Sequence, residues 1–562
     1  MLMKMMNLLN KMRTAVVIGM VVLASGCSDF LDVDPDSALK QDQLYTDYKD
    51  IFALKFGMYD MLQSTVDQMF VIGEAPSDLI VAGPGAKGAY KDVAEFIDNN
   101  VSPSNQYLDW TNYYQLINHC NDALVRLPKL RDENPLWLKT VYYTGVTGQV
   151  IYDMVVAEVL WMRAYAYLQL VRSWGDVPFF TTPMYTVEDA KNSMSVFTDR
   201  DLILNQLEKD LLWVSDHSWL NWNWTNYIYG AWNHQTMNSC SALNLLADVY
   251  MVRGKYNEAW SNNCLLKIVH PGFYSPANEH YYDSWSIAGT AFQGGKSWQF
   301  VLWRVANEFA SGSGGSIWRE QGLVLAFDTE DLTSHGGQYK EAHSLMKWAN
   351  NRSEDGGAYV VKPSRPAVAN WLRATDQWRG LNASFAIDNY NGRTDTIIWK
   401  FVGLNSAQGV VEARRGTDRK NGIGNVHIYR TADLWLRGAE CANRLGLTAE
   451  ALSIVNQVRG RVGVIRTPLG LNATVNEVED AIMTERALEL AFEGYRWHDL
   501  ARVSRTRRDP SYLIDKVVEK ELNLVKREQM RARLELQATA ADPADWFLLP
   551  IHEKVALFTP NL

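Results

Sequence analysis

The sequence predicts a mainly α fold, in which tetratricopeptide-like stacked helix pairs form a scaffold beside a loop-rich irregular half containing short strands. Three observations carry this prediction. Residues 150–174 are apolar on nearly every face, one segment has the small-aromatic-glycine spacing of a close-packed helix hairpin and a second repeats much of it, and residues 271–426 change to Gly, Ser, Asn and aromatics. A helix that is apolar all round belongs inside a large protein, and repeated hairpin spacing indicates stacked pairs.

Residues 1–26 have the layout of a lipoprotein signal peptide. A basic region precedes ten apolar residues, 15–24, and Ser25-Gly26 then leads to Cys27. Ten residues are too few to span a bilayer core of about 30 Å, so the run predicts a cleaved secretory signal. The small-small-Cys ending resembles a lipobox, which makes Cys27 the expected lipidation site. The alternative is an ordinary signal peptide with an incidental cysteine.

The next segment, residues 27–48, is expected to be a lipidated acidic tether, followed by a single domain over residues 49–562. Asp32, Asp34 and Asp36 imitate the start of a calcium-binding loop. Ser37 stands where that loop needs Gly, however, and Gln43 stands where it needs a bidentate Glu. We therefore expect no calcium in the tether.

Charge and cysteine spacing exclude two further classes of protein. A formal charge of -9 and a pI near 5.7 argue against a nucleic-acid partner, because that affinity comes largely from Lys and Arg. After Cys27, the remaining cysteines show no CxxC pair and no zinc spacing. We expect no metal and no cofactor, and expect these cysteines to be buried small residues.

The helices are predicted in chain order. One covers residues 150–174 and ends at Gly175, since Pro178 prevents its resumption. Residues 239–268 are expected to form two helices broken at Gly254, and Ala439, Ala442, Gly446 and Ala451 repeat much of their spacing. Two further helices are predicted at residues 107–127 and 477–503. The scaffold is thus expected over about 49–270 and 427–562, around an irregular segment at about 271–426.

A series of short motifs runs in order along nearly the whole mature chain. They are Cys27-Ser28-Asp29-Phe30-Leu31-Asp32, Glu158, Arg163-Ala164, Trp174-Gly175-Asp176-Val177-Pro178, residues 430–440, Val455-Asn456-Gln457-Val458-Arg459, Glu485-Arg486, Glu489-Leu490, Glu493-Gly494, residues 496–500 and Leu549-Pro550-Ile551. Through these motifs the chain resembles the SusD/RagB family of outer-membrane nutrient-binding lipoproteins.

This resemblance implies a SusD-like fold and a non-catalytic, cell-surface lipoprotein of the outer membrane. Such a protein would bind an oligosaccharide or polysaccharide and deliver it to a partner SusC-like TonB-dependent transporter, over which it sits as a lid. Some family members take peptides instead, so a peptide-binding lipoprotein stays open as an alternative. The 21 Trp residues favour a glycan only weakly.

Six residues are expected to bind the ligand. By the place of ligand aromatics in the family, Tyr90, Trp285 and Trp318 are candidates for stacking on sugar rings, with Trp378 and Arg379 as weaker ones. Asp78 is the expected partner of a sugar hydroxyl. The alternative for each aromatic is packing beneath its own loop.

A surface glycoside hydrolase is the rival class, and its strongest evidence is Glu485, Glu489 and Glu493 on one helix face. Their spacing resembles the carboxyl separation of a retaining glycosidase. Side chains four residues apart point the same way, whereas catalytic carboxylates must approach the bond from different sides. We therefore expect an ion-pair network with the nearby Arg486 and Arg496. Glu158 and Arg163, inside an apolar helix, are each expected to have a partner in the core.

Overall fold

The structure is a computed structural model of the chain. It describes residues 48, 50–143, 146–218, 237, 239–269, 324–325, 360–374, 379–381, 384–390, 393–398, 404–405, 412–413, 426–429, 431–461, 469–470 and 472–556. The predicted signal peptide and nearly all of the tether lie outside these residues.

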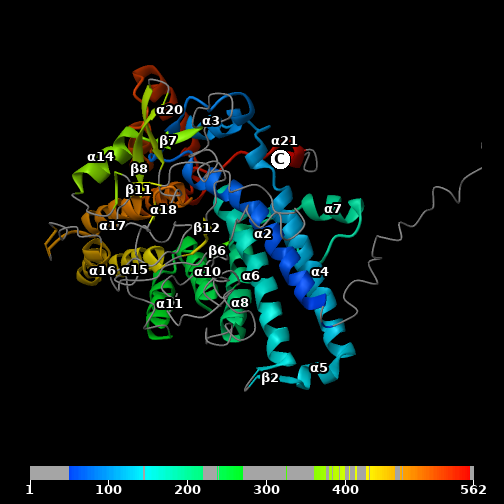
Figure 1. The fold of residues 1–562 in the computed structure, drawn as a ribbon. Helices are drawn as coiled ribbons and strands as arrows, with labels where there is room; N and C mark the ends of the chain where they lie inside the picture. Colours follow the sequence, from blue (N-terminus) through cyan, green and yellow to red (C-terminus); the bar gives the residue numbers. More distant parts are fainter. Residues whose placement is uncertain are drawn as a thin grey trace, which may run out of the picture.

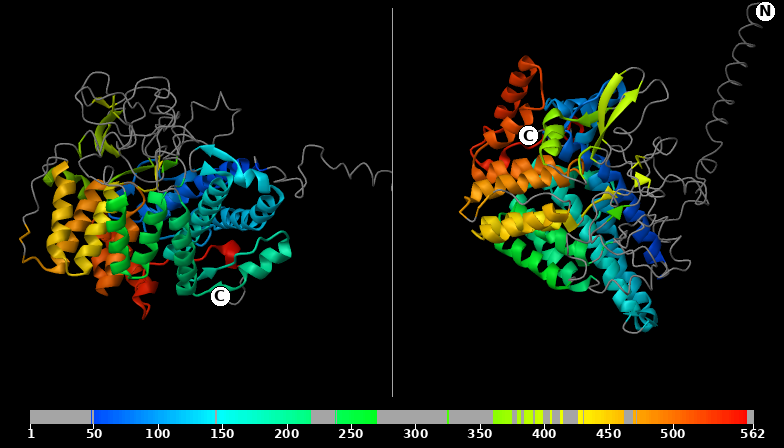
Figure 2. Two further views of the ribbon diagram at one scale, coloured as in Figure 1. Left: turned by 90° about the horizontal axis from the view of Figure 1, so that it is seen from below. Right: turned by 60° about the vertical axis from the view of Figure 1, so that its left-hand side comes forward.

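The scaffold is a continuous array of packed helices. Each helix packs on the next from α2 through α4, α6, α8, α10 and α11 to α15, which in turn contacts α16 and α17. Figure 2, seen from below, shows the later members of the array standing side by side. The bounds are α2 Asp50–Glu74, α4 Thr111–Glu133, α6 Gly148–Trp174, α8 Arg200–His217, α10 Ser239–Val252, α11 Tyr256–Val269, α15 Thr431–Arg444, α16 Thr448–Arg461 and α17 Val475–Glu489. The predicted mainly α scaffold of stacked pairs is confirmed.

Helix α6 is the centre of the N-terminal half (Figure 1). The Thr147 hydroxyl accepts a hydrogen bond from the Val150 N–H at its start, and Gly175, with φ of 80°, ends it. Among the described residues, α6 is the one helix long and apolar enough to cross a membrane, but 89% of its apolar window is buried in the protein. It is a core helix, as its sequence predicted.

The two predicted hairpins are present. Gly254 lies between α10 and α11, and Gly446 lies between α15 and α16, with φ of 68° and 80°. This left-handed backbone region costs any residue with a Cβ. Each glycine therefore allows the tight turn on which close antiparallel packing depends.

Two predicted helices have different bounds. The helix expected at 107–127 begins at Thr111, after a 3-10 turn, and continues past Pro128 to Glu133. The helix expected at 477–503 is two helices, α17 and α18 (Arg496–Arg507). Phe492 and Gly494 break it with positive φ, and their N–H groups donate to the carboxylate of Glu74 at 2.7 and 3.0 Å. The break therefore depends on a contact from the far end of the chain.

The described strands form six separate antiparallel pairs. They are β1 (Ile80–Ala82) with β7 (Val361–Pro363), β2 (Val141–Tyr143) with β3 (Val146–Thr147), β4 (Val177–Pro178) with β5 (Phe197–Thr198), β6 (Val324–Leu325) with β12 (Val426–His427), β8 (Phe385–Tyr390) with β9 (Arg393–Ile398), and β10 (Leu404–Asn405) with β11 (Glu412–Ala413). Seven of these strands and helix α14 (Arg365–Arg373) lie in the predicted irregular segment, as expected.

The remaining described helices lie outside this array. They are α3 (Lys91–Ile97), α5 (Pro135–Lys139), α7 (Val187–Met194), α19 (Ser511–Val518), α20 (Leu524–Gln537) and α21 (Glu553–Ala556). The C-terminal segment then returns to α6: the Trp174 indole donates to the carbonyl of Pro550 at 3.0 Å, and the Leu549 N–H donates to the Ser173 carbonyl at 2.9 Å. The Trp174 and Leu549-Pro550 motifs thus meet in space.

Candidate functional site

The loop that carries Tyr90 lies beside strands of the irregular half (Figure 1). Strand β1, which leads into this loop, pairs with β7, and the Gly83 N–H donates to the carbonyl of Val360 at 2.8 Å. Lys362 on β7 forms an ion pair with Asp395 on β9 at 2.9 Å. Two regions far apart in sequence, the 83–90 loop and the β7–β9 strands, therefore form one surface.

Tyr90 is half-buried at the end of this loop. It belongs to a 3-10 turn, Gly88–Tyr90, and comes directly before α3. The turn depends on Gly88, whose φ is 59°, and the Tyr90 N–H donates to the Lys87 carbonyl at 3.2 Å. Part of the ring packs against the hydrophobic core. The ring thus has a supported position and a side that reaches solvent.

Asp78, expected to bind a sugar hydroxyl, is buried in an ion pair. Its two carboxylate oxygens accept hydrogen bonds from Arg496 Nε and a terminal nitrogen, both at 2.7 Å. Burial alone would raise the pKa of Asp78, but the charge and hydrogen bonds of Arg496 outweigh it, so the pKa is lowered. The carboxylate faces the protein interior and supports β1.

Arg379, the other charged candidate, is also internal. Its guanidinium contacts the Glu485 carboxylate at 2.7 Å and the Glu489 carboxylate at 2.8 Å, and all three side chains are 0% exposed. Arg459 adds a second contact to Glu485 at 3.2 Å. An ion-pair network on α17 is therefore present as predicted, but the arginines on Glu485 and Glu489 are Arg379 and Arg459. The expected Arg486 and Arg496 form ion pairs with aspartates instead. The arginine contacts leave the Glu485 and Glu489 carboxylates no direct path to a glycosidic bond.

The other candidates, Trp285, Trp318 and Trp378, lie outside the described residues, as does Cys27. The structure thus brings Tyr90 to a surface, places Asp78 and Arg379 in the protein interior, and leaves the three tryptophans as predictions. No group of three metal-ligating side chains occurs within the part of the chain that the structure describes. Cys120 and Cys441 are buried free thiols, as expected of them.

Both charged residues inside α6 have the expected partners. The Glu158 carboxylate contacts the Lys55 ammonium at 2.7 Å and accepts a hydrogen bond from the Tyr59 hydroxyl at 2.8 Å. Arg163 contacts Asp210 at 2.8 Å and donates to Asn121 at 3.0 Å. These charged groups are paired, as their apolar setting requires.

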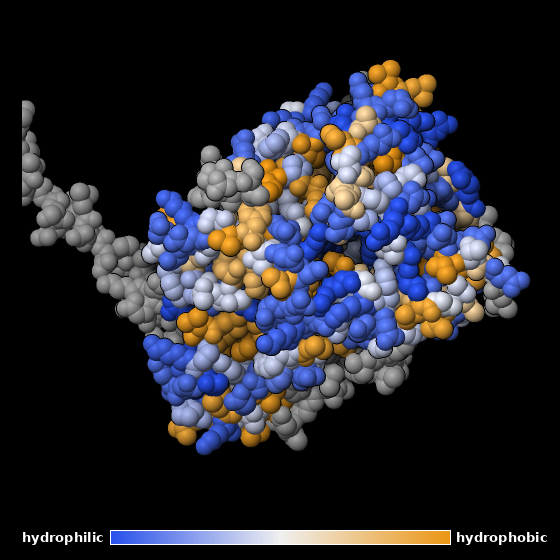
Figure 3. All heavy atoms as spheres, turned by 180° about the vertical axis from the view of Figure 1, so that it is seen from behind, coloured by the Kyte–Doolittle hydropathy of each residue, from blue (hydrophilic) through white to orange (hydrophobic). Residues whose placement is uncertain are grey.

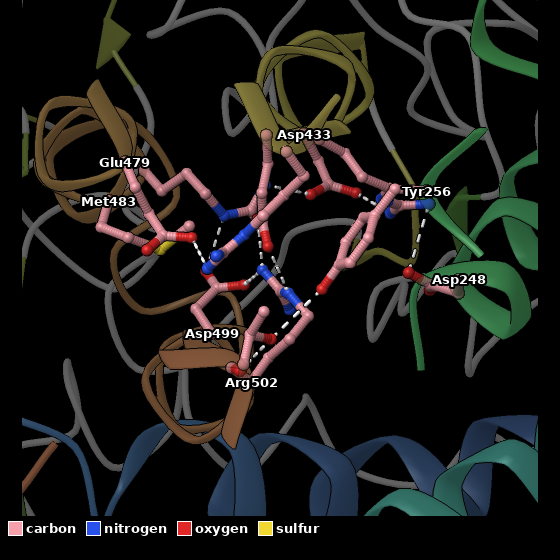
Figure 4. Close-up of polar contacts among 12 residues, drawn as sticks. Asp248, Tyr256, Asp433, Glu479, Met483, Asp499 and Arg502 are labelled. Atoms are coloured by element: carbon pink, nitrogen blue, oxygen red, sulfur yellow. Dashed lines mark hydrogen bonds and ion pairs between the residues drawn. The ribbon is translucent and has the colours of Figure 1, made fainter. Parts of the chain in front are cut away.

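A larger set of charged side chains joins α10, α15, α17 and α18 (Figure 4). We call it the ionic seam, and its members are Asp248, Asp433, Arg437, Glu440, Arg486, Asp499 and Arg502. Arg486 bridges two of the helices, at 2.9 Å from Asp433 and 2.7 Å from Asp499. Arg502 then connects Asp499 to Glu440, at 2.8 and 2.7 Å. The family motifs at 430–440 and 496–500 meet in this seam.

Residues 74–79, here called the crossing segment, position the Tyr90 loop. They begin at Glu74, the last residue of α2, and lead directly into β1. The Lys520 ammonium donates to the carbonyls of Pro76 and Ser77 at 2.9 and 2.7 Å, and the Ser364 hydroxyl donates to the Asp78 carbonyl at 2.5 Å. Together with the contacts of Glu74 and Asp78 described above, residues between 364 and 520 hold this N-terminal segment in place.

Sequence reasoning missed the roles of Glu74 and Lys520. Both side chains are buried, at 0% and 3% exposure. Glu74 follows the apolar run Met69–Ile72, so the signal that marked Glu158 and Arg163 was also present there. For Lys520 no such pattern exists, because its neighbours Glu519 and Glu521 are charged.

Comparison with known proteins agrees with this geometry. A model described as the SusD family matches residues 215–556, and one described as starch-binding associating with outer membrane matches residues 29–218. Two relatives from Formosa agariphila, SusD-like proteins P38 and P25, are each 25% identical; the matches cover 87% and 85% of this chain and 90% and 86% of theirs.

Solved structures share the fold. A laminarin binding SusD-like protein has a TM-score of 0.59 at 22% identity, over 91% of this chain and 98% of its own. A SusD superfamily protein from Bacteroides thetaiotaomicron has a TM-score of 0.61 at 18% identity, over 92% and 97%. For B. fragilis NanU the TM-score is 0.60 at 16% identity, over 94% and 98%. On the match of the family model to residues 215–556, this chain belongs to the SusD family.

Proposed function

We propose that this protein is a non-catalytic lipoprotein of the outer membrane that captures an oligosaccharide or polysaccharide and passes it to a partner TonB-dependent transporter. The observation that carries the proposal is family membership, with one matching model described as starch-binding and outer-membrane-associated. A fold neighbour titled as laminarin binding gives the same substrate class. In this proposal the chain is anchored through Cys27, faces the cell exterior, and forms a single domain over residues 49–562.

The surface around Tyr90 supports this proposal. A sugar ring needs a flat apolar face to stack on, held in place before the ligand arrives. Tyr90 has its ring partly packed on the core and its loop tied to β7. We propose that Trp285, Trp318 and Trp378 also contact the glycan. Asp78 and Arg379, which are buried, stabilise the fold that holds the site.

The primary test is affinity electrophoresis of the detergent-solubilised, full-length protein in gels containing laminarin, starch or other polysaccharides. We expect retardation by at least one polysaccharide and no release of reducing ends from it. Retardation with turnover would favour the hydrolase. Binding of peptides, with no retardation by any polysaccharide, would favour the peptide-binding alternative.

Replacing Tyr90 tests the site. Loss of a stacking platform should weaken binding by about 1 to 3 kcal/mol, which is roughly 5- to 150-fold. The matched control is Tyr185→Ala, because Tyr185 is an exposed tyrosine that precedes α7, on another part of the surface. Equal retardation of Tyr90→Ala and the control would remove Tyr90 from the site without touching the proposed function.

Delivery requires the partner. Affinity purification from mildly solubilised membranes should recover this protein together with a large β-barrel transporter, because hand-over needs the two in contact. Permanent complexes typically bury above about 2,000 Å² and survive purification. Recovery of the lipoprotein alone, with the transporter demonstrably expressed, would count against delivery and leave glycan capture standing.

A further inference from the structure

One end of the molecule forms a projecting tip. Helices α4 and α6 extend side by side to the lower end of the view in Figure 1, where α5 and the β2–β3 hairpin connect them. The right-hand view of Figure 2 also shows this end standing clear of the other described elements. Helix α20 lies at the opposite end (Figure 1).

The tether enters the fold at this tip. Tyr48, the first described residue, stacks on Trp137 of α5 with ring centroids 5.2 Å apart and an angle of 19° between the rings. The stretch from Cys27 to Tyr48 reaches at most about 70 Å when fully extended. The chain that comes from the proposed anchor at Cys27 therefore joins the described fold at this tip.

The tip also exposes aliphatic side chains. Leu136 is 82% exposed, the highest value among the large hydrophobic residues of the described part, and Val141 is 65% exposed. Lys139 is exposed between them in the sequence. Across the face seen from behind in Figure 3, apolar residues are scattered among hydrophilic ones. Exposed aliphatic side chains also gather at the start of α20, where Leu522, Leu524 and Val525 are 63%, 70% and 68% exposed. The tip differs from that group because the proposed anchored end of the chain enters beside it.

We propose that this tip rests on the lipid surface, with Leu136 and Val141 in the interfacial region. The proposal depends on the anchoring at Cys27 proposed above. Two aliphatic side chains on a narrow tip cannot provide the roughly 800 Å² that each partner contributes to a standard protein interface. A lipid surface needs no such complementary shape, and it accepts shallowly inserted apolar side chains beside a basic one.

The experiment uses the full-length acylated protein in phosphatidylcholine-phosphatidylglycerol vesicles. An environment-sensitive fluorophore is placed at Leu136→Cys or, as the matched control, at Leu524→Cys. Leu524 is a 70% exposed leucine at the start of α20, at the opposite end. Cys240 and Cys264 are replaced by Ser in both proteins. We expect lipids brominated near the interface to quench the probe at residue 136 and to leave the probe at residue 524 unchanged.

A second variant tests the role of the side chains. With a probe at Val141→Cys, the additional change Leu136→Glu should abolish quenching while the protein still floats with the vesicles through its acyl chains. Equal quenching at residues 136 and 524, or none at 136 in protein that floats, would overturn the proposal. So would a probe at residue 136 that is shielded only when the transporter is added, because the tip would then be a protein contact. If the protein does not float with the vesicles, the result would instead contradict the proposed anchoring at Cys27.

Discussion

The two halves of the scaffold are built from similar helices and are held together differently. Around α6, the contacts with α4 and α8 are mostly apolar. The ion pairs of Glu158 and Arg163 are separate from each other within these apolar surroundings. Between α10, α15, α17 and α18, the ionic seam links seven charged side chains in series. Apolar contacts tolerate changes of shape, whereas a buried series of charges does not tolerate the loss of one member.

The largest effect is expected where the seam loses a bridging member. Arg486→Met leaves Asp433 and Asp499 buried with fewer partners, and should lower the free energy of unfolding by about 3 to 5 kcal/mol. The matched control, Arg531→Met, removes an exposed ion pair to Asp515 and should cost less than about 1 kcal/mol. Urea denaturation measures both. Similar losses would mean that the seam contributes no more than a surface pair.

A smaller effect is expected from the isolated pair on α6. Lys55→Met should cost about 3 kcal/mol, because the Glu158 carboxylate keeps its bond from Tyr59 but loses its counter-charge. Replacing both residues by Met should recover most of that loss, since no buried charge is left over. A double-mutant cycle measures this recovery. If the double variant is no more stable than Lys55→Met, the pair does not behave as an isolated unit.

The third prediction concerns pH. Burial lowers the pKa of Lys520 to about 7, from an ordinary value of 10.5. Above pH 7 the unfolded chain therefore holds a proton that the folded protein lacks, so this residue makes stability rise between pH 7 and the ordinary value. Denaturation at several pH values from 7 to 9 should show a steeper rise for the wild type than for Lys520→Met. The exposed Lys526→Met serves as control, and parallel curves for all three proteins would contradict the prediction.

The smallest effects are expected at the hairpin turns, where the two halves should behave alike. Gly254→Ala and Gly446→Ala each place a Cβ in a left-handed conformation, at a cost of about 1 to 2 kcal/mol. Nothing lies within 4 Å of the added Cβ at either position, so the cost is purely one of backbone conformation. Gly460→Ala, inside α16 and equally uncrowded, should instead be neutral or stabilising. Unequal losses at the two turns would show that the hairpins are not equivalent.

Local patterns were enough to predict the scaffold. The apolar character of α6, the glycine of each hairpin and the charged residues within an apolar helix each depend on neighbours in the sequence. The break between α17 and α18 could not be predicted in that way, because Glu74, which binds the turn, lies 418 residues from Phe492.

The candidate site was harder to predict for the same reason. Asp78 and Arg379 have the side chains that a sugar hydroxyl needs, and the sequence offered no sign that Arg496 and Glu485 occupy them. Those partners are 418 and 106 residues away. Tyr90 became a candidate through the family resemblance, whereas the local sequence indicates only a glycine-containing loop.

The crossing segment has a consequence for the order in which the protein assembles. Its hydrogen bonds from Phe492, Gly494, Arg496 and Lys520 span 418 to 444 residues. A chain made from its N-terminus holds the Tyr90 loop long before it holds these donors, and contacts of such long range form slowly. The loop therefore reaches its final position only after the C-terminal helices have arrived. A chain shortened before residue 492 would keep the hairpins of the scaffold and lose the support of the surface that we propose binds glycans.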